Sequence, residues 1–153
     1  MKTWLRGLFS ALLLGVCALA HATGYTLPDL DGRMQSLDQY RDKWVIVNFW
    51  ATWCGTCRKE LPDLASLHEK HRDGDIVVVG INFEEIGRQE LKDFVAAQNI
   101  PYPVLRTVPV RKTPLGPVPA LPTTYIVNPA GKVVAGEIGL VTQQNLEDYI
   151  ASQ

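Results

Sequence analysis

Two long apolar segments dominate the pattern of the chain. Trp44–Trp50 reads WVIVNFW and Ile76–Phe83 reads IVVVGINF. Continuous apolar runs rich in β-branched residues are typical of strands that are buried on both faces of a parallel sheet. Apolar residues recur at helical spacing in residues 57–71, after the first run, and in residues 88–98, after the second. This alternation predicts an α/β fold in which helices flank a central sheet.

Shorter segments extend this core at both ends. Asp31-Gly32 separates two β-rich segments and predicts a β-hairpin that precedes the core. Thr123–Val127 and residues 132–138 flank another turn and predict a second, antiparallel hairpin, which makes the central sheet a mixed one. The remaining expected elements are a short strand at 102–105 and a C-terminal helix at 142–151.

Residues 106–121 interrupt this pattern. The segment holds Pro109, Pro114, Pro117 and Pro119. Proline has no backbone N–H to donate, so four prolines in a short stretch argue against a helix or a central strand. We expect an ordered or extended loop here.

Composition limits the classes of protein to consider. The chain has 153 residues, of which 46% are apolar and 20% charged, as expected for one globular domain rather than a disordered chain. The formal net charge is −1, so no strongly basic surface for nucleic acid is implied. Three cysteines, Cys17, Cys54 and Cys57, are too few for a disulfide-stapled mini-protein or a four-cysteine zinc site.

The N-terminus has the layout of a secretory signal peptide. Two basic residues are followed by uncharged, mostly apolar residues at 8–20 and by an A-x-A pattern that ends at Ala22. We therefore predict a signal peptide at 1–22 and a folded domain at 23–153.

Two alternatives to cleavage stay open. An uncleaved membrane anchor is one, because no charged residue occurs between Gly7 and Pro28. A lipid-modified Cys17 is the other, although the preceding valine is bulkier than is usual at such a position. Each alternative exports the domain. After cleavage Cys54 and Cys57 are the only cysteines, which makes them natural partners.

The segment Trp53-Cys54-Gly55-Thr56-Cys57 carries the candidate chemistry. Two cysteines separated by two residues, directly after a buried strand and at the start of a helix, form a thiol–disulfide motif. The helix N-terminus presents unpaired N–H groups and partial positive charge, which stabilise a thiolate. We predict Cys54 as the nucleophile and Cys57, which is one turn further on and more buried, as the resolving cysteine. Gly55 and Thr56 keep the turn small and leave room for a partner chain.

A structural disulfide and a zinc site are two other interpretations of the cysteine pair. A purely structural disulfide would gain little stability, because the closed loop is so short. A zinc site would add His68 and His71, but His68 lies eleven residues beyond Cys57, about 16 Å along a continuous helix. Ligands of one zinc ion cannot be that far apart. We expect His68 to be a partly buried packing residue.

Two stretches occur together, NFWATWCGTCRKELP at 48–62 and LPTTYIVNPAGK at 121–132. Their combination resembles the exported thioredoxin-like proteins of the TlpA, ResA and CcmG type, and the resemblance covers nearly the whole mature chain. It implies a thioredoxin fold and redox work in the periplasm, usually as a reductant. It also implies that the redox group is the Cys54–Cys57 disulfide itself, with no other cofactor.

The resemblance assigns roles beyond the cysteines. Pro122 matches the family's cis-proline, and a proline between a loop and a strand is a reasonable place for a cis bond. Its missing N–H would expose the backbone of Leu121 for pairing with a substrate strand. Together with Trp53, Gly55 and Thr56, these two residues form the expected substrate-binding surface.

A carboxylate is expected to handle the thiol proton. In thioredoxin an acid lies six residues before the first cysteine, but that position here is Asn48, which does not titrate. The resemblance to ResA-type proteins places the acid at Glu60, one helical turn after Cys57. Held near a thiol and away from water, its pKa would be raised and it could take the proton. A solvated glutamate is the alternative for Glu60, and Glu84 or Glu85, after the second buried strand, are alternative proton handlers.

The residues between the cysteines bear on the direction of electron flow. Gly55-Thr56 contains no cation to stabilise the thiolate of Cys54, which favours a reductase over an oxidase or isomerase. The resemblance implies two partners: a client protein with a cysteine pair, in cytochrome c maturation or copper-centre assembly, and a membrane thiol transporter as electron donor. We expect a monomer that binds no nucleic acid and no metal. A Cu(I) metallochaperone without turnover is the rival, although a third soft ligand is missing from the motif.

Segment 106–119 departs from the family pattern, because relatives commonly have a short helical stretch before the cis-proline. The proline-rich replacement is either a docking surface for a particular client or a rigid loop.

Overall fold

The computed structural model describes residues 24–110 and 112–153. The expected signal peptide or anchor at 1–22, which includes Cys17, lies outside the described residues. Within the two described ranges, no helix combines the length and the apolar character needed to cross a membrane.

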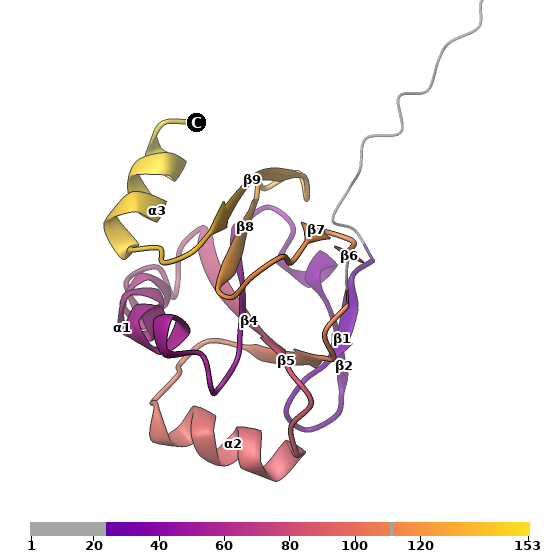
Figure 1. The fold of residues 1–153 in the computed structure, drawn as a ribbon. Coiled ribbons are helices and arrows are strands. Elements are labelled where there is room, and N and C mark those ends of the chain that lie inside the picture. Colours follow the sequence, from indigo (N-terminus) through magenta and orange to yellow (C-terminus); the bar gives the residue numbers. More distant parts are fainter. Residues whose placement is uncertain (1–23, 111) are drawn as a thin grey trace, which may run out of the picture.

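A five-stranded mixed sheet with the order β5-β4-β3-β8-β9 forms the centre of the fold (Figure 1). The two long apolar segments are its parallel neighbours β3 (Trp44–Trp50) and β4 (Ile76–Phe83), and β5 (Val104–Thr107) runs parallel to β4. On the other side, β8 (Thr123–Val127) pairs antiparallel with β3, and β9 (Val133–Ile138) pairs antiparallel with β8. The predicted α/β fold with a mixed sheet is confirmed.

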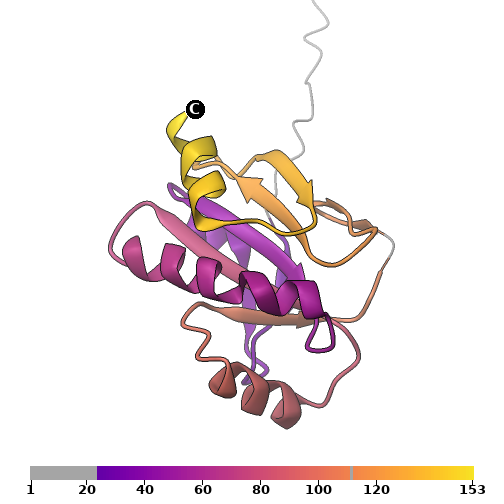
Figure 2. The same ribbon diagram turned by 60° about the vertical axis from the view of Figure 1, so that its left-hand side comes forward.

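Three helices cover one face of the sheet: α1 (Gly55–Lys70), α2 (Arg88–Ala97) and α3 (Gln143–Ala151). The first two are crossovers between parallel strands, and right-handed crossovers that proceed in one direction place their helices on the same side. Figure 2 shows α1 crossing in front of the sheet, with α3 above it and α2 below it in this view. Their inward residues Leu64, Leu91 and Leu146 join Ile46 and Val78 of the sheet in one core cluster.

No long helix covers the opposite face of the sheet in the described residues. The N-terminal hairpin and the proline-rich segment cover it instead. The predicted N-terminal hairpin consists of β1 (Thr26–Pro28) and β2 (Met34–Ser36), and the short 3-10 helix η1 (Leu37–Tyr40) follows it. A bridge between Asp29 and Leu105 attaches the hairpin to the edge strand β5. Buried residues of this region belong to a second core cluster on this face of the sheet.

The proline-rich segment completes that cover. It contains two short antiparallel strands, β6 (Lys112–Thr113) and β7 (Gly116–Pro117), within the ordered loop that the sequence predicts. Leu115, between these strands, is buried in the second core cluster. The hydroxyl of Tyr125 in β8 donates a hydrogen bond to the carbonyl of Pro117 at 2.5 Å. Contacts with the sheet therefore order a segment whose own propensity for regular structure is low.

Several element boundaries differ from the prediction by one or two residues, and two of the shifts have a clear cause in the backbone. β5 begins at Val104 and not at residue 102, because Pro103 has no N–H to donate; its carbonyl accepts the N–H of Gly80 at 2.9 Å. α1 begins at Gly55 and not at residue 57, because Cys54 caps the helix through its side chain.

The burial of Leu115 gives a test of how the proline-rich segment is held. Leu115→Ala should lower the free energy of unfolding by about 2–4 kcal/mol, because it leaves a cavity against the sheet. Val108→Ala is the control, because this residue of the same segment is 52% exposed; it should change stability by less than about 0.5 kcal/mol. Equilibrium urea denaturation measures both variants. Equally small effects would show that the segment is not part of the core.

Candidate active site

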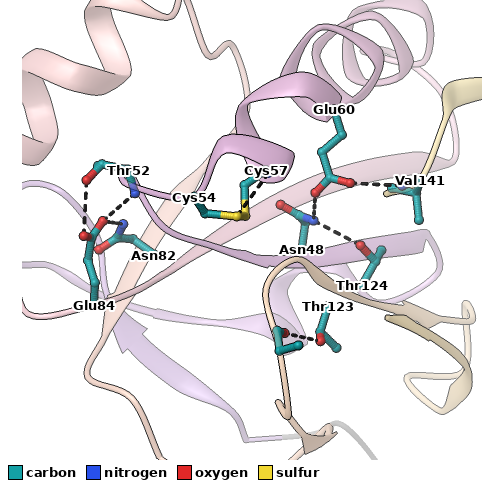
Figure 3. Close-up of a disulfide and its surroundings, with 11 residues drawn as sticks. Asn48, Thr52, Cys54, Cys57, Glu60, Asn82, Glu84, Thr123, Thr124 and Val141 are labelled. Carbon is teal, nitrogen blue, oxygen red and sulfur yellow. Dashed lines mark hydrogen bonds between the residues drawn. A yellow bond between two sulfur atoms is a disulfide. The ribbon is translucent and has the colours of Figure 1, made fainter. Parts of the chain in front are cut away.

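The two cysteines lie at the edge of the sheet where the parallel strands end. Cys54 and Cys57 form a disulfide at the beginning of α1 (Figure 3). The backbone N–H of Cys57 donates to the Sγ of Cys54 at 3.1 Å, so this sulfur caps the helix. Cys54 is 6% exposed and Cys57 is fully buried. The sulfur of Cys54 is therefore the one nearer to solvent, and it lies at the positive end of the helix dipole.

Glu84 holds the loop that leads to the disulfide. Its carboxylate accepts the backbone N–H of Thr52 at 2.7 Å, the hydroxyl of Thr52 at 3.2 Å and the side-chain amide of Asn82 at 2.7 Å. Figure 3 shows this group on one side of the disulfide and Glu60 on the other. Glu84 thus lies at the predicted edge, but its oxygens are engaged with the loop. Glu85 is exposed.

Glu60 is fully buried on the inner side of α1, so it is not a solvated helix residue. One carboxylate oxygen accepts the side-chain amide of Asn48 at 2.7 Å, and the other accepts the backbone N–H of Val141 at 3.0 Å. Burial raises the pKa of Glu60 to about 6, the two hydrogen bonds oppose this rise, and the charge of Asp63 adds to it. The carboxyl group therefore changes protonation state close to neutral pH.

Two further residues interact with this buried polar group, Thr124 through a hydrogen bond and Tyr102 through its charge interaction with Glu60. The side-chain amide of Asn48 also donates to the hydroxyl of Thr124 in β8 at 3.0 Å. Burial and the charge of Glu60 raise the pKa of the Tyr102 phenol. The sequence analysis did not identify Thr124, Val141 or Tyr102 as residues that interact with this group. The second threonine of the LPTT motif was a signal for Thr124, whereas Val141 contributes only its backbone and leaves no signal in the sequence.

Pro122 lies beside the strand that carries the cysteine loop. The Leu121–Pro122 peptide bond is cis, as expected. Because Thr123 pairs with Phe49, Pro122 is level with the end of β3, where the loop to Cys54 begins. Leu121 is half-buried and packs against both core clusters, one of which contains the cysteines.

The other predicted substrate-contacting residues are accessible next to the disulfide. Trp53 is 69% exposed, and Gly55 and Thr56 are exposed in the first turn of α1. Ile138 and Leu140, on the segment whose Gly139 N–H donates to the Pro122 carbonyl, are also large exposed apolar residues. The sequence analysis did not single out these two residues, because nothing in the local pattern distinguishes them from core positions of a strand.

His68 and His71 are engaged away from the cysteines. The Nδ1 of His68 accepts the backbone N–H of Val78 at 3.4 Å, and its ring packs edge-on against Tyr102, so the expected partly buried packing role is confirmed. A ring nitrogen of His71 lies 3.0 Å from a carboxylate oxygen of Glu147 on α3. Among residues 24–110 and 112–153, no three potential metal ligands gather in one place.

A cysteine pair at the N-terminus of the first long helix, opposite a cis-proline at the start of the antiparallel strand, defines the class of this protein. The chain is a thiol–disulfide oxidoreductase with a thioredoxin fold.

Comparison with known proteins gives its family. The AhpC/TSA family profile matches residues 19–135, so the chain belongs to that family. Over 129 residues it is 30% identical to the thiol-disulfide oxidoreductase ResA of Bacillus subtilis, a match that covers 84% of this chain and 72% of ResA. The resemblance drawn from the motifs is thereby confirmed.

Solved structures agree with this assignment. A thiol:disulfide interchange protein from Chlorobium tepidum matches with a TM-score of 0.73 and 25% identity, covering 86% of this chain and 94% of that chain. A secreted thiol-disulfide isomerase from Corynebacterium glutamicum matches with a TM-score of 0.71 and 31% identity, covering 80% of this chain and 81% of that chain.

The contacts of Glu84 predict a specific effect on the cysteine loop. Glu84→Ala should accelerate hydrogen exchange of the Thr52 amide by at least about tenfold, because a bond to a charged acceptor contributes about 1.5–3 kcal/mol. Glu85→Ala removes the same charge from the neighbouring exposed position and should leave this exchange rate unchanged. Amide exchange followed by NMR measures both, and an unchanged rate in Glu84→Ala would contradict the assignment of Glu84 as the residue that holds the loop.

Proposed function

We propose that this protein is an exported reductase that opens disulfides in client proteins, with Cys54 as the nucleophile and Cys57 as the resolving cysteine. The single observation that carries this assignment is the asymmetry of the two sulfurs. Cys54 caps α1 and keeps a small exposed area of 6%, whereas Cys57 is fully buried one turn along the helix. A thiolate at Cys54 is stabilised by the helix N-terminus and is open to attack a client.

The reaction proceeds in two exchanges. The Cys54 thiolate attacks one sulfur of a client disulfide, which breaks that bond, forms a mixed disulfide and releases a client thiolate. Cys57 then loses its proton and attacks the Sγ of Cys54, which forms the intramolecular disulfide and releases the second client sulfur as a thiolate. Two electrons pass to the client. A dithiol donor, which we propose to be a membrane thiol transporter, returns two electrons to the Cys54–Cys57 pair.

Glu60 is the proposed acceptor for the proton of Cys57. It lies one helical turn beyond Cys57, on the same buried side of α1. The pKa of about 6 leaves its carboxylate largely ionised at neutral pH and only a modest energetic step from protonation. Glu84 is a weaker candidate, because it is only half-buried and holds the loop before Cys54, on the other side of the disulfide from Glu60 (Figure 3).

The client is proposed to bind across the exposed surface formed by Trp53, Gly55, Thr56, Leu121 and Pro122. A client segment that pairs with the Leu121 backbone would bring its cysteine to Cys54. We propose clients that need their cysteine pairs reduced in the periplasm, in cytochrome c maturation or copper-centre assembly. Similarity to a protein described as secreted supports the exported location.

The redox equilibrium of residues 23–153 against glutathione or dithiothreitol tests the direction of the reaction. We expect a reduction potential well below about −200 mV, because Gly55-Thr56 provides no cation to stabilise the reduced thiolate. Thr56→His is the matched variant: a cation between the cysteines should raise the potential toward the value of about −120 mV found for a strong oxidant. A potential near that value in the unaltered protein would identify an oxidase.

The pH dependence of the second exchange tests Glu60. The rate at which the mixed disulfide is resolved should rise with pH through about 6, as Glu60 loses its own proton and becomes a base. Glu60→Gln should abolish this rise and slow resolution by about 100-fold or more. Glu69→Gln, at an exposed position on the same helix, is the control and should keep the profile. Rapid quenching with a peptide disulfide gives the rates, and the same profile in Glu60→Gln would exclude Glu60 as the acceptor.

A further inference from the structure

Asn48 carries a buried hydrogen-bond acceptor that the oxidised protein does not use. Its side chain is fully buried, and its amide nitrogen donates both to Glu60 Oε1 at 2.7 Å and to Thr124 Oγ1 at 3.0 Å. Its Oδ1 is buried and has no hydrogen-bond partner in the described part of the chain. Buried carbonyl oxygens are rarely left unpaired, because nothing replaces the lost hydrogen bond to water.

The neighbours of Asn48 fix the orientation of its amide. A flipped amide would direct its oxygen at the Glu60 carboxylate, and two acceptors repel at such a short distance. The nitrogen therefore faces Glu60. Figure 3 shows the oxygen on the other side, facing the disulfide of Cys54 and Cys57.

The register of β3 explains why this amide lies under the cysteines. Side chains alternate along a strand, so Asn48 shares a face with Ile46 and Trp50, and these two belong to the core cluster that contains both cysteines. Cys57 and Glu60, one turn apart on α1, are both fully buried against this face. A disulfide sulfur has no hydrogen to donate, which accounts for the unpaired Oδ1.

We propose that Asn48 is the positioning residue of the resolving cysteine: when the disulfide is reduced, its Oδ1 accepts a hydrogen bond from the S–H of Cys57. This proposal rests on the proposed function, which assigns Cys57 as the resolving cysteine. Reduction by a dithiol breaks the sulfur–sulfur bond, adds two electrons, and leaves a thiolate at Cys54 and a newly protonated thiol at Cys57. A donor thus forms where the unpaired acceptor already lies.

This hydrogen bond would keep Cys57 protonated until resolution. A hydrogen bond to the neutral form of a group disfavours its charged form. The Glu60 carboxylate accepts a hydrogen bond from the N–H of the same Asn48 amide. This bond polarises the amide and makes Oδ1 a stronger acceptor. When Cys57 attacks, its proton goes to Glu60, and Asn48 itself carries no proton. The other titratable groups around this turn are Cys54, Asp63 and Tyr102, the last two through their charge interaction with Glu60.

Two substitutions of Asn48 in the Cys54→Ser protein separate this role from a structural one. Asn48→Leu removes the acceptor, so the thiolate fraction of Cys57 at a fixed, mildly alkaline pH should rise about tenfold. Asn48→Asp keeps an oxygen facing Cys57 while its other oxygen shares a proton with Glu60, so the thiolate fraction should stay unchanged or fall. Both variants lose the two hydrogen bonds that Asn48 donates. A structural role would therefore shift the thiolate fraction in the same direction in both.

Ultraviolet absorbance of the thiolate, recorded against pH, measures the fraction. Ile46→Ala is the control, because it weakens the core on the same face of β3 without touching the polar group; it should leave the titration of Cys57 unchanged. Circular dichroism identifies any variant that does not fold. Shifts of the same sign in Asn48→Leu and Asn48→Asp, or no shift in Asn48→Leu, would overturn the proposal. The titration does not depend on the direction of electron flow, so a failed reductase assignment would be seen separately in the redox potential.

Discussion

A buried carboxylate on α1 fixes the arrangement on which the site depends. An ionisable group without access to water requires hydrogen-bond partners, and those of Glu60 come from β3 and from the segment that leads into α3. The carboxylate can be satisfied only if the helix, the central strand and the C-terminal unit meet at one point. The same packing buries Cys57 between the helix and the sheet. The same hydrogen bonds that hold the packing thus determine where a buried carboxylate lies relative to Cys57.

The disulfide lies between two carboxylates that have different tasks because their surroundings differ. Glu84 is only half-buried and accepts hydrogen bonds from the loop before Cys54, which sets the path of the backbone. Glu60 is fully buried, and the loss of water raises its pKa toward neutrality. Glu84 therefore holds the loop before Cys54, and Glu60 has a carboxyl group whose pKa lies close to neutrality.

Much of the fold followed from local patterns. The two apolar runs became the central parallel strands, and the helical periodicities became the crossover helices, because both patterns report burial on a particular face. The prolines correctly excluded a helix from residues 106–121. They did not show that Leu115 would enter the second core or that β6 and β7 would pair, since both depend on contacts with β8. The start of α1 differs from the prediction because the sulfur of Cys54 caps the helix, and the start of β5 differs because Pro103 has no N–H.

The sequence by itself determined the reactive pair and its place between a buried strand and a helix, because both are encoded within a few consecutive residues. It indicated Pro122 and Glu60 through family resemblance and left Glu84 and Glu85 as alternatives to Glu60. Only the tertiary structure distinguished them, because the pKa and the accessibility of a carboxylate depend on partners far away in the chain. For Glu60 those partners are Asn48, twelve residues away, and Val141, 81 residues away. Burial and long-range hydrogen bonding exist only once the chain has folded, and they give the two acids their different surroundings.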